Sequence, residues 1–311
     1  MAQELKPPAA GTKLGAGDAV MLATAFLFGS SFPIAKPVLP IMDPAFFAAS
    51  RYLVAGIALF AWLALRGQRL SAAGADWRLL LFCAAVFGVF QVGWSFALSL
   101  TNASVGAIFV ATSPLWGTLL ATLDGQRLRA LGWFGIVLAF CGVALVINNS
   151  LSALTIEFGS LSSSLLWLAI AFLWAFFVAR SPPLVGQLGA IRMFAWVMVL
   201  AAAMAAPLAA WGALATPWEQ MRPVLWLNYL YTALFTAALA LALWNVGLAR
   251  LGVTRTMIYM YMVPLFAIAI AVIFLGESMT PARWIGAAAV IAGIAITRAA
   301  ATGPAAPAAE P

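Results

Sequence analysis

The sequence has no histidine and very little charge. Asp, Glu, Lys and Arg make up 8% of its 311 residues, whereas 65% of the residues are hydrophobic. A soluble domain needs roughly a quarter of its residues charged, so this composition excludes a soluble protein. Histidine and carboxylates supply most metal ligands and acid–base groups in enzymes, and no carboxylate lies near the centre of an apolar stretch. We therefore expect no catalytic residue, no metal and no cofactor.

Cysteine is also scarce. Cys83 and Cys141 are the only two, and both lie inside apolar stretches. They give neither a disulfide framework nor the spacing of a metal site. The net charge is +7, but the basic residues are spread over short loops rather than clustered. We therefore expect no nucleic-acid partner; the expected partners are membrane lipid and a small-molecule substrate.

Ten apolar stretches, each about long enough to cross a bilayer, fill almost the whole chain. The expected spans are 18–38, 44–65, 77–98, 104–123, 130–148, 160–180, 188–211, 224–248, 254–275 and 282–298. The first of them lacks a convincing cleavage site, so we interpret it as a transmembrane helix rather than a signal peptide. The sequence predicts an all-α membrane protein with ten transmembrane helices.

The last five stretches weakly repeat the first five. Residues 104–114 match residues 254–264 at a constant offset, and Trp94 matches Trp244 at the same offset. A repeat with an odd number of spans places its two copies upside down relative to each other. Secondary transporters bind their substrates between such inverted repeats, so the pattern favours transport over other membrane functions.

Lysine and arginine predict the orientation. An N-terminus in the cytoplasm leaves only four of the sixteen basic residues on the outer side: Lys36, Arg51, Arg222 and Arg283. Cytoplasmic loops carry the excess of basic residues in membrane proteins, so the sequence predicts N-in and C-in termini. The expected divisions are a cytoplasmic segment 1–17, a first five-helix repeat 18–150, a second repeat 151–300 and a disordered tail 301–311.

Several short motifs resemble the drug/metabolite transporter superfamily, in its ten-helix branch built from two EamA-type repeats. They are Phe28-Gly29-Ser30-Ser31-Phe32, Arg51-Tyr52-Leu53, Ser113-Pro114-Leu115, Val263-Pro264-Leu265, Leu275-Gly276-Glu277 and Trp284-Ile285-Gly286. The family often has Trp-Gly in the first motif, where this chain has Phe28-Gly29. The resemblance implies a multi-pass protein of the bacterial inner membrane that carries amino acids, nucleosides, sugar phosphates or drugs. The bacterial exporters of aromatic amino acids are the most similar group.

Helix interruptions near the membrane centre are the first candidates for function. Gly29 and Pro33 flank two serines in the first span, where proline removes a backbone hydrogen bond and glycine eases bending. Pro114 and Pro264 occupy matching positions in the fourth and ninth spans. We expect these four residues to be hinges, with helix packing through small residues and static kinks as the alternatives.

Substrate-binding candidates share a deep position and either a large ring or a polar group that is costly in lipid. They are Ser30, Ser31, Gln91, Trp94, Ser113, Trp167, Trp174, Trp244, Asn245, Tyr259 and Tyr261. Helix–helix hydrogen bonds are the alternative for the two amides, and a lipid-facing stripe is the alternative for Trp167 and Trp174. Lys36 and Arg51 are expected at the outer mouth. Lys36 would attract a carboxylate there, and extension to lipid headgroups or pairing with Asp43 is the alternative.

The expected function is export of amino acids, aromatic and other neutral ones, and related small metabolites across the inner membrane by alternating access. We expect a monomer whose cavity lacks a buried counter-charge and therefore rejects lysine and aspartate. Drug or nucleoside efflux is the alternative within transport. A membrane sensor or lipid-modifying enzyme is the alternative outside it, although the chain has neither an evident soluble output domain nor histidine. Substrate, direction and proton coupling stay open.

Overall fold

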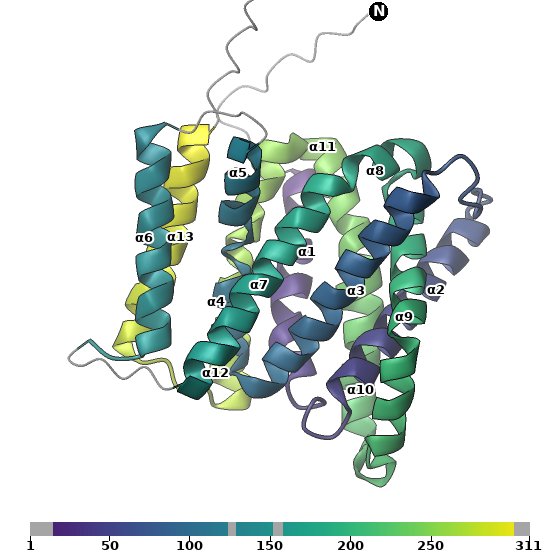
Figure 1. Ribbon diagram of the computed structural model, residues 1–311, viewed down its shortest axis with the longest axis horizontal. Helices are drawn as coiled ribbons and strands as arrows, with labels where there is room; N and C mark the ends of the chain where they lie inside the picture. Colours follow the sequence, from purple (N-terminus) through teal and green to yellow (C-terminus); the bar gives the residue numbers. More distant parts are fainter. Residues whose placement is uncertain (1–14, 124–128, 152–157, 302–311) are drawn as a thin grey trace, which may run out of the picture.

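The computed structural model describes residues 15–123, 129–151 and 158–301, and within these ranges all regular structure is helical (Figure 1). Most of the expected N-terminal segment and C-terminal tail lies outside the described residues. The helices of the first half are α1 (Ala16–Ala35), α2 (Pro44–Leu65), α3 (Trp77–Leu100), α4 (Ala103–Val110), α5 (Ser113–Leu123) and α6 (Ala130–Asn148).

The second half is divided into nine elements, against six in the first. Its helices are α7 (Phe158–Arg180), α8 (Pro182–Leu188), α9 (Ala190–Ala215), η1 (Trp218–Gln220), α10 (Pro223–Tyr231), the π-helix η2 (Thr232–Leu239), α11 (Ala240–Met260), α12 (Met262–Leu275) and α13 (Pro281–Ala301). Among the described residues, eight helical segments are long and apolar enough to cross a membrane, and two shorter apolar segments, Met262–Leu275 and Pro281–Thr297, complete the expected ten.

The packing partners of the helices show the inverted repeat. Helix α1 packs against α11 and α12, and α7, the first helix of the second half, packs against α3 and α5. Two antiparallel pairs join corresponding helices of the halves: α2 with α9, and α6 with α13. In Figure 1 these pairs stand at opposite ends of the molecule, with the other helices between them. The arrangement confirms the duplicated helical fold that the sequence predicted.

Glycine makes the α6–α13 contact unusually close. A Cβ atom on Gly135 would lie 2.6 Å from the carbonyl oxygen of Gly293, and one on Gly142 would lie 2.6 Å from that of Gly286. Conversely, a Cβ atom on Gly293 would lie 2.5 Å from the carbonyl oxygen of Gly135, and one on Gly286 would lie 2.7 Å from that of Gly142. Small residues of this kind let helix backbones approach in membranes, where lipid offers little hydrophobic drive for association. The four glycines therefore face one another across the pair.

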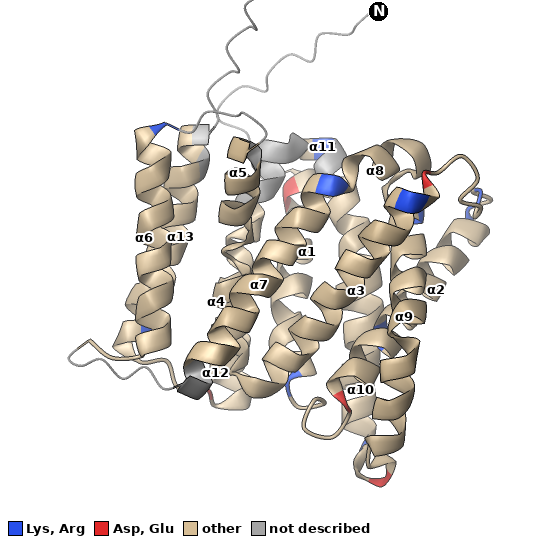
Figure 2. Ribbon diagram, viewed as in Figure 1, with Lys and Arg blue, Asp and Glu red and all other residues tan. Residues whose placement is uncertain are grey.

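Charged side chains mark the two edges of the bundle. Figure 2 shows basic residues along the edge where α7 ends and α3 and α6 begin, and acidic residues near both edges. Arg180 ends α7, Arg78 is in the first turn of α3 and Arg129 precedes α6. We expect this basic edge to be the cytoplasmic one.

One expected boundary between spans is absent. The sequence predicts a loop between residues 248 and 254, but α11 is helical without interruption from Ala240 to Met260. In the first half the corresponding break falls at Thr101 and Asn102, both in extended backbone conformations. A lone glycine such as Gly252 does not end a helix by itself, and no proline follows it until Pro264.

Candidate functional site

The paired prolines lie at helix interruptions. Helix α4 ends at Val110 and α5 begins at Ser113, so Pro114 is in the first turn of α5. In the second half α11 ends at Met260 and α12 begins at Met262, which places Pro264 in its first turn. Proline is tolerated in a first turn, where its missing N–H would have no partner within the helix. The hydroxyl of Ser113 donates to the carbonyl of Val110 at 2.6 Å, which occupies one backbone acceptor at the break.

Helix α1, in contrast, continues through its proline. Pro33 lies inside α1, which is regular from Ala16 to Ala35. A Cβ atom on Gly29 would lie 2.6 Å from the carbonyl oxygen of Val263. Gly29 thus permits close packing of α1 on α12 just beside the break before that helix. The Ser31 hydroxyl donates to the carbonyl of Phe28 at 2.6 Å, which satisfies it within its own helix.

Arg51 on α2 lies in the interior of the bundle, rather than at the outer mouth where the sequence analysis expected it. Its side chain is 2% exposed. The guanidinium carbon lies 4.5 Å from the ring centroid of Tyr52, 4.8 Å from that of Trp94 and 5.1 Å from that of Phe47. Its Nη2 donates to the hydroxyl of Tyr52 at 2.7 Å and to Oε1 of Gln91 at 3.3 Å. We call Phe47, Tyr52, Gln91 and Trp94 the Arg51 box.

The Arg51 box contains no negative charge. In the part of the chain that the structure describes, no carboxylate pairs with this guanidinium, and its Nε has no hydrogen-bond partner. A desolvated cation–π contact is worth about 2 kcal/mol, whereas desolvating an ion costs several kcal/mol. Three aromatic rings and two neutral hydrogen-bond acceptors thus surround the guanidinium in place of a counter-charge.

An aromatic cluster continues from the box toward α1 and α7. The ring of Trp94 lies 5.2 Å from Phe32 and 6.4 Å from Trp167, edge to face in the second case. Trp167 is fully buried, and its Nε1 donates to Oγ1 of Thr101 at 2.8 Å. Aromatic pairs at such distances stabilise a packed site beyond the area they bury. Trp167 faces the bundle and not lipid.

Trp174 extends the same face of α7. Its ring lies 5.2 Å from Phe90 on α3 and stacks on Phe177 at 5.8 Å. It therefore packs against α3, the helix that carries Gln91 and Trp94. The structure brings together four of the sequence-predicted residues from α3 and α7: Gln91, Trp94, Trp167 and Trp174.

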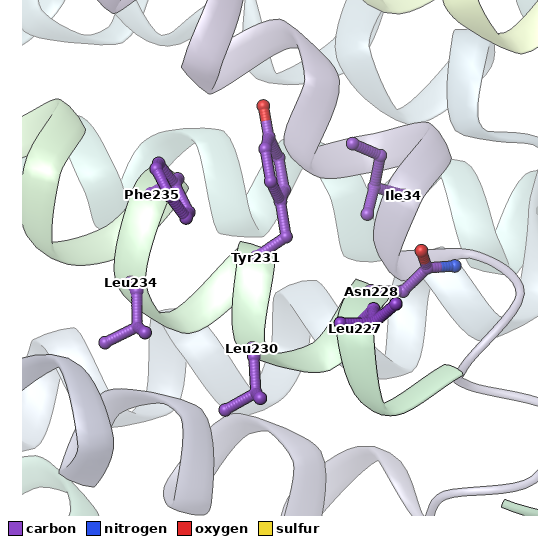
Figure 3. A pocket seen from close by; sticks show the side chains of 7 residues that line it. All are labelled: Ile34, Leu227, Asn228, Leu230, Tyr231, Leu234 and Phe235. Atoms are coloured by element: carbon purple, nitrogen blue, oxygen red, sulfur yellow. The ribbon is translucent and has the colours of Figure 1, made fainter. Parts of the chain in front are cut away.

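A second polar contact joins the halves at Ser30. The hydroxyls of Ser30 and Tyr231 lie 2.9 Å apart. Tyr231 ends α10 where the π-helix η2 begins, and such segments occur frequently at functional sites. It lines an open groove of about 340 Å³ with mostly apolar neighbours (Figure 3), namely Ile34, Leu227, Asn228, Leu230, Leu234 and Phe235. Tyr231 is not among the binding residues predicted from the sequence. The sequence feature that could have indicated it is a tyrosine followed by a threonine within an apolar span.

The remaining candidates lie apart from the Arg51 box. The ring of Trp244 lies 6.5 Å from that of Phe28, and Nδ2 of Asn245 donates to the carbonyl of Leu241 at 2.7 Å in its own helix. The hydroxyl of Tyr259 donates to Oδ1 of the buried Asp18 at 2.6 Å. Tyr261 is half-buried at the break between α11 and α12.

Lys36 contacts the end of a helix instead of lying at an open outer mouth of the transporter. Nζ of Lys36 donates to the carbonyls of Leu98 and Ser99 at 2.8 and 3.1 Å, in the last turn of α3, where a cation complements the helix dipole. Burial lowers the pKa of Lys36, and the nearby Glu277 partly offsets that effect. Lys36 therefore serves as a cap in this conformation.

The comparisons with known proteins agree with this architecture. The model of the EamA-like transporter family matches the chain twice, over residues 15–148 and 161–299. An "Uncharacterized transporter" of Archaeoglobus fulgidus is 27% identical over 289 residues, which cover 90% of this chain and 96% of the relative. The "Uncharacterized inner membrane transporter YedA" of Escherichia coli K12 is 27% identical, with 87% of each chain covered. A solved structure described as "Crystal structure of protein" shares the fold, with a TM-score of 0.66 at 18% identity over 92% of this chain and 98% of that one.

Proposed function

The chain belongs to the EamA-like transporter family, and we propose that it exports amino acids, aromatic and other neutral ones, and related small metabolites by alternating access. It is a multi-pass inner-membrane protein that transports small solutes, and not an enzyme. The proposal adds the chemical class of the solute, the direction of transport and the mechanism.

The observation that carries the proposal is the aromatic cluster beside the Arg51 box. Trp94 contacts the guanidinium of Arg51 at 4.8 Å and the ring of Trp167 at 6.4 Å. A polar region and an apolar region therefore meet at one side chain, which suits a solute with a charged end and an apolar body. Binding sites for such ligands combine apolar and aromatic walls with a few polar groups that fix orientation.

Alternating access is supported by the paired interruptions. The breaks before Pro114 and Pro264 occupy corresponding positions in the two repeats, and α4 packs against α12. Transporters with inverted repeats expose a central site alternately to the two sides, and broken helices near the midplane are a recurrent part of such machines. We propose that each break bends during one half of the transport cycle.

The test is transport by the purified full-length protein in liposomes. Labelled phenylalanine should be taken up, and unlabelled tyrosine, tryptophan and leucine should compete better than alanine, since each buried CH₂ contributes about 0.8 kcal/mol. A panel of nucleosides and apolar organic cations tests the alternative of nucleoside or drug efflux. Uptake of a nucleoside or a cation with no uptake of any amino acid would reject amino acid export.

A further inference from the structure

We propose that Arg51 binds the carboxylate of the transported solute, so that the protein selects solutes bearing this group. The inference rests on the proposed function and refines it. It also replaces the expectation of a cavity without a buried counter-charge. The sequence predicted Arg51 at the outer mouth, but its charge lies inside the bundle.

The unused hydrogen-bonding capacity of Arg51 is the first argument. Arginine has five N–H donors in a planar fork that matches a carboxylate. Two hydrogen bonds to side chains come from Nη2, and the buried Nε has none. A carboxylate beside Nε and Nη2 would supply two charge-assisted hydrogen bonds. It would replace the bond to Oε1 of Gln91, which is long at 3.3 Å, and leave the 2.7 Å bond to Tyr52 in place.

Arg192, an arginine of the second repeat, shows how an arginine with a structural role differs. Arg192 lies near the start of α9, the partner helix of α2. Its Nε donates to the carbonyl of Leu188 at 2.9 Å, and its Nη1 donates to that of Arg69 at 3.4 Å. Arg192 thus fixes a helix start and a loop, whereas no backbone acceptor meets the guanidinium of Arg51 among the described residues. The guanidinium of Arg192 thus bonds to backbone carbonyls, whereas that of Arg51 bonds to side-chain oxygens.

The position of the box is the second argument. Phe47, beneath the guanidinium, lies 6.0 Å from Tyr229 on α10, so the box borders the second repeat. On its other side Trp94 leads to Phe32 on α1 and Trp167 on α7. A carboxylate at Arg51 would therefore place an attached apolar side chain toward these rings. Because Arg51 is 2% exposed, a solute reaches it only in a conformation in which the box has opened.

The test compares three solutes that differ in one group: phenylalanine, phenylalaninamide and 3-phenylpropionate. In liposomes containing the full-length protein, the two carboxylates should compete for uptake of labelled phenylalanine, and the amide should compete weakly. In Arg51→Gln the preference for carboxylate over amide should fall about 10-fold to 100-fold, the range expected when a hydrogen bond to a charged group is lost. Arg51→Lys should keep part of it, because the charge remains but the fork does not.

Two further variants separate a binding role from a structural one. Arg192→Gln, the matched control, should keep the wild-type preference. Gln91→Glu places a carboxylate beside Arg51, so it should abolish competition by carboxylate solutes while raising the melting temperature. This second variant keeps the test informative if Arg51→Gln fails to fold.

The outcomes distinguish the two proposals. Equal competition by phenylalanine and its amide in the wild type would overturn the role of Arg51 while leaving amino acid transport intact. Retention of the wild-type carboxylate preference in folded Arg51→Gln or Gln91→Glu would overturn it as well. Arg51-dependent uptake of 3-phenylpropionate without uptake of phenylalanine would reject amino acid export but support carboxylate recognition.

Discussion

A carboxylate oxygen of Glu277, in the segment between α12 and α13, accepts a hydrogen bond from the backbone nitrogen of Ala103 at 2.7 Å. Its other oxygen accepts from the backbone nitrogen of Ser104 at 3.1 Å and from the hydroxyl of that serine at 2.5 Å. A residue of the second repeat thus caps the first turn of α4 in the first repeat, where an anion also complements the helix dipole.

Removing the charge of this cap should destabilise the protein. We expect Glu277→Gln to lower the free energy of unfolding by about 0.5–2 kcal/mol, the usual cost of losing an N-terminal cap. Thermal unfolding in detergent measures the effect. Glu219→Gln, at an exposed glutamate in η1, is the matched control and should leave the melting temperature unchanged. Equal melting temperatures for both variants and the wild type would show that the cap contributes nothing.

A methyl group at Gly142 should disrupt the α6–α13 pair. Its Cβ would lie 2.6 Å from the carbonyl oxygen of Gly286, so the helices must separate, and overpacking of this kind costs about 1–3 kcal/mol. Gly142→Ala should therefore lower the melting temperature. Gly117→Ala is the control, because nothing lies within 4 Å of a Cβ built there. Indistinguishable unfolding of the two variants would contradict the close contact.

Substitution of Pro264 should slow transport without weakening binding. If the break before α12 bends during the cycle, Pro264→Ala should favour a continuous helix and reduce kcat several-fold with little change in KM. Pro207→Ala, inside α9 and away from any interruption, should leave kcat unchanged. Initial rates of phenylalanine uptake over a range of concentrations give both constants. Unaltered kcat in a well-folded Pro264 variant would make the break a static feature.

Truncation of Trp94 should alter solute preference more than truncation of Trp244. Trp94→Ala removes a wall of the aromatic cluster and a cation–π contact with Arg51, so preference for phenylalanine over alanine should fall about two-fold to tenfold, as expected for losing about 0.5–1.5 kcal/mol of aromatic contact. Trp244 lies outside the cluster beside Phe28, and its alanine variant should keep the preference. Competition by a panel of amino acids measures both. The opposite ranking would place the site in the second repeat.

Both termini should lie in the cytoplasm. A single cysteine introduced before Asp18 or after Arg298, in a variant lacking Cys83 and Cys141, should react with a membrane-impermeant maleimide only after the membrane is permeabilised. The basic edge of the bundle motivates this expectation (Figure 2). Labelling of intact cells at either end would exclude the N-in, C-in topology.

The sequence predicted those features that depend on local chemistry. Proline favours helix interruptions, and Pro114 and Pro264 located two breaks, although α1 continues through Pro33 and α9 through Pro207. The loop at residues 248–254 was predicted wrongly because hydropathy changes there while the backbone stays helical. A change in polarity marks a membrane boundary only when helix-ending residues accompany it.

The interior position of Arg51 could not be read from the sequence. Arg51 is the eighth residue of α2, roughly 10 Å from the start of the helix at 1.5 Å per residue, a depth from which arginine can extend to the headgroups. The contacts of its guanidinium with the rings of Tyr52 on α2 and Trp94 on α3 show that the side chain turns inward. Likewise, no sequence pattern predicts the π-helix after Tyr231, which packs against α2 and α1.

The close α6–α13 pair has a mechanical consequence. Carbonyl oxygens of each helix fill the space where the other helix would carry Cβ atoms, so neither helix can slide along its partner without a steric clash. At the far end, Gly56 of α2 gives a second tight seam, where a Cβ would lie 2.7 Å from Cγ2 of Val199 on α9. The two close helix pairs, α6–α13 and α2–α9, therefore resist relative movement of their helices. We expect the proposed transport cycle to bend the helices between these two pairs, where the chain is already broken at α4–α5 and α11–α12, rather than to rock the halves as whole bodies.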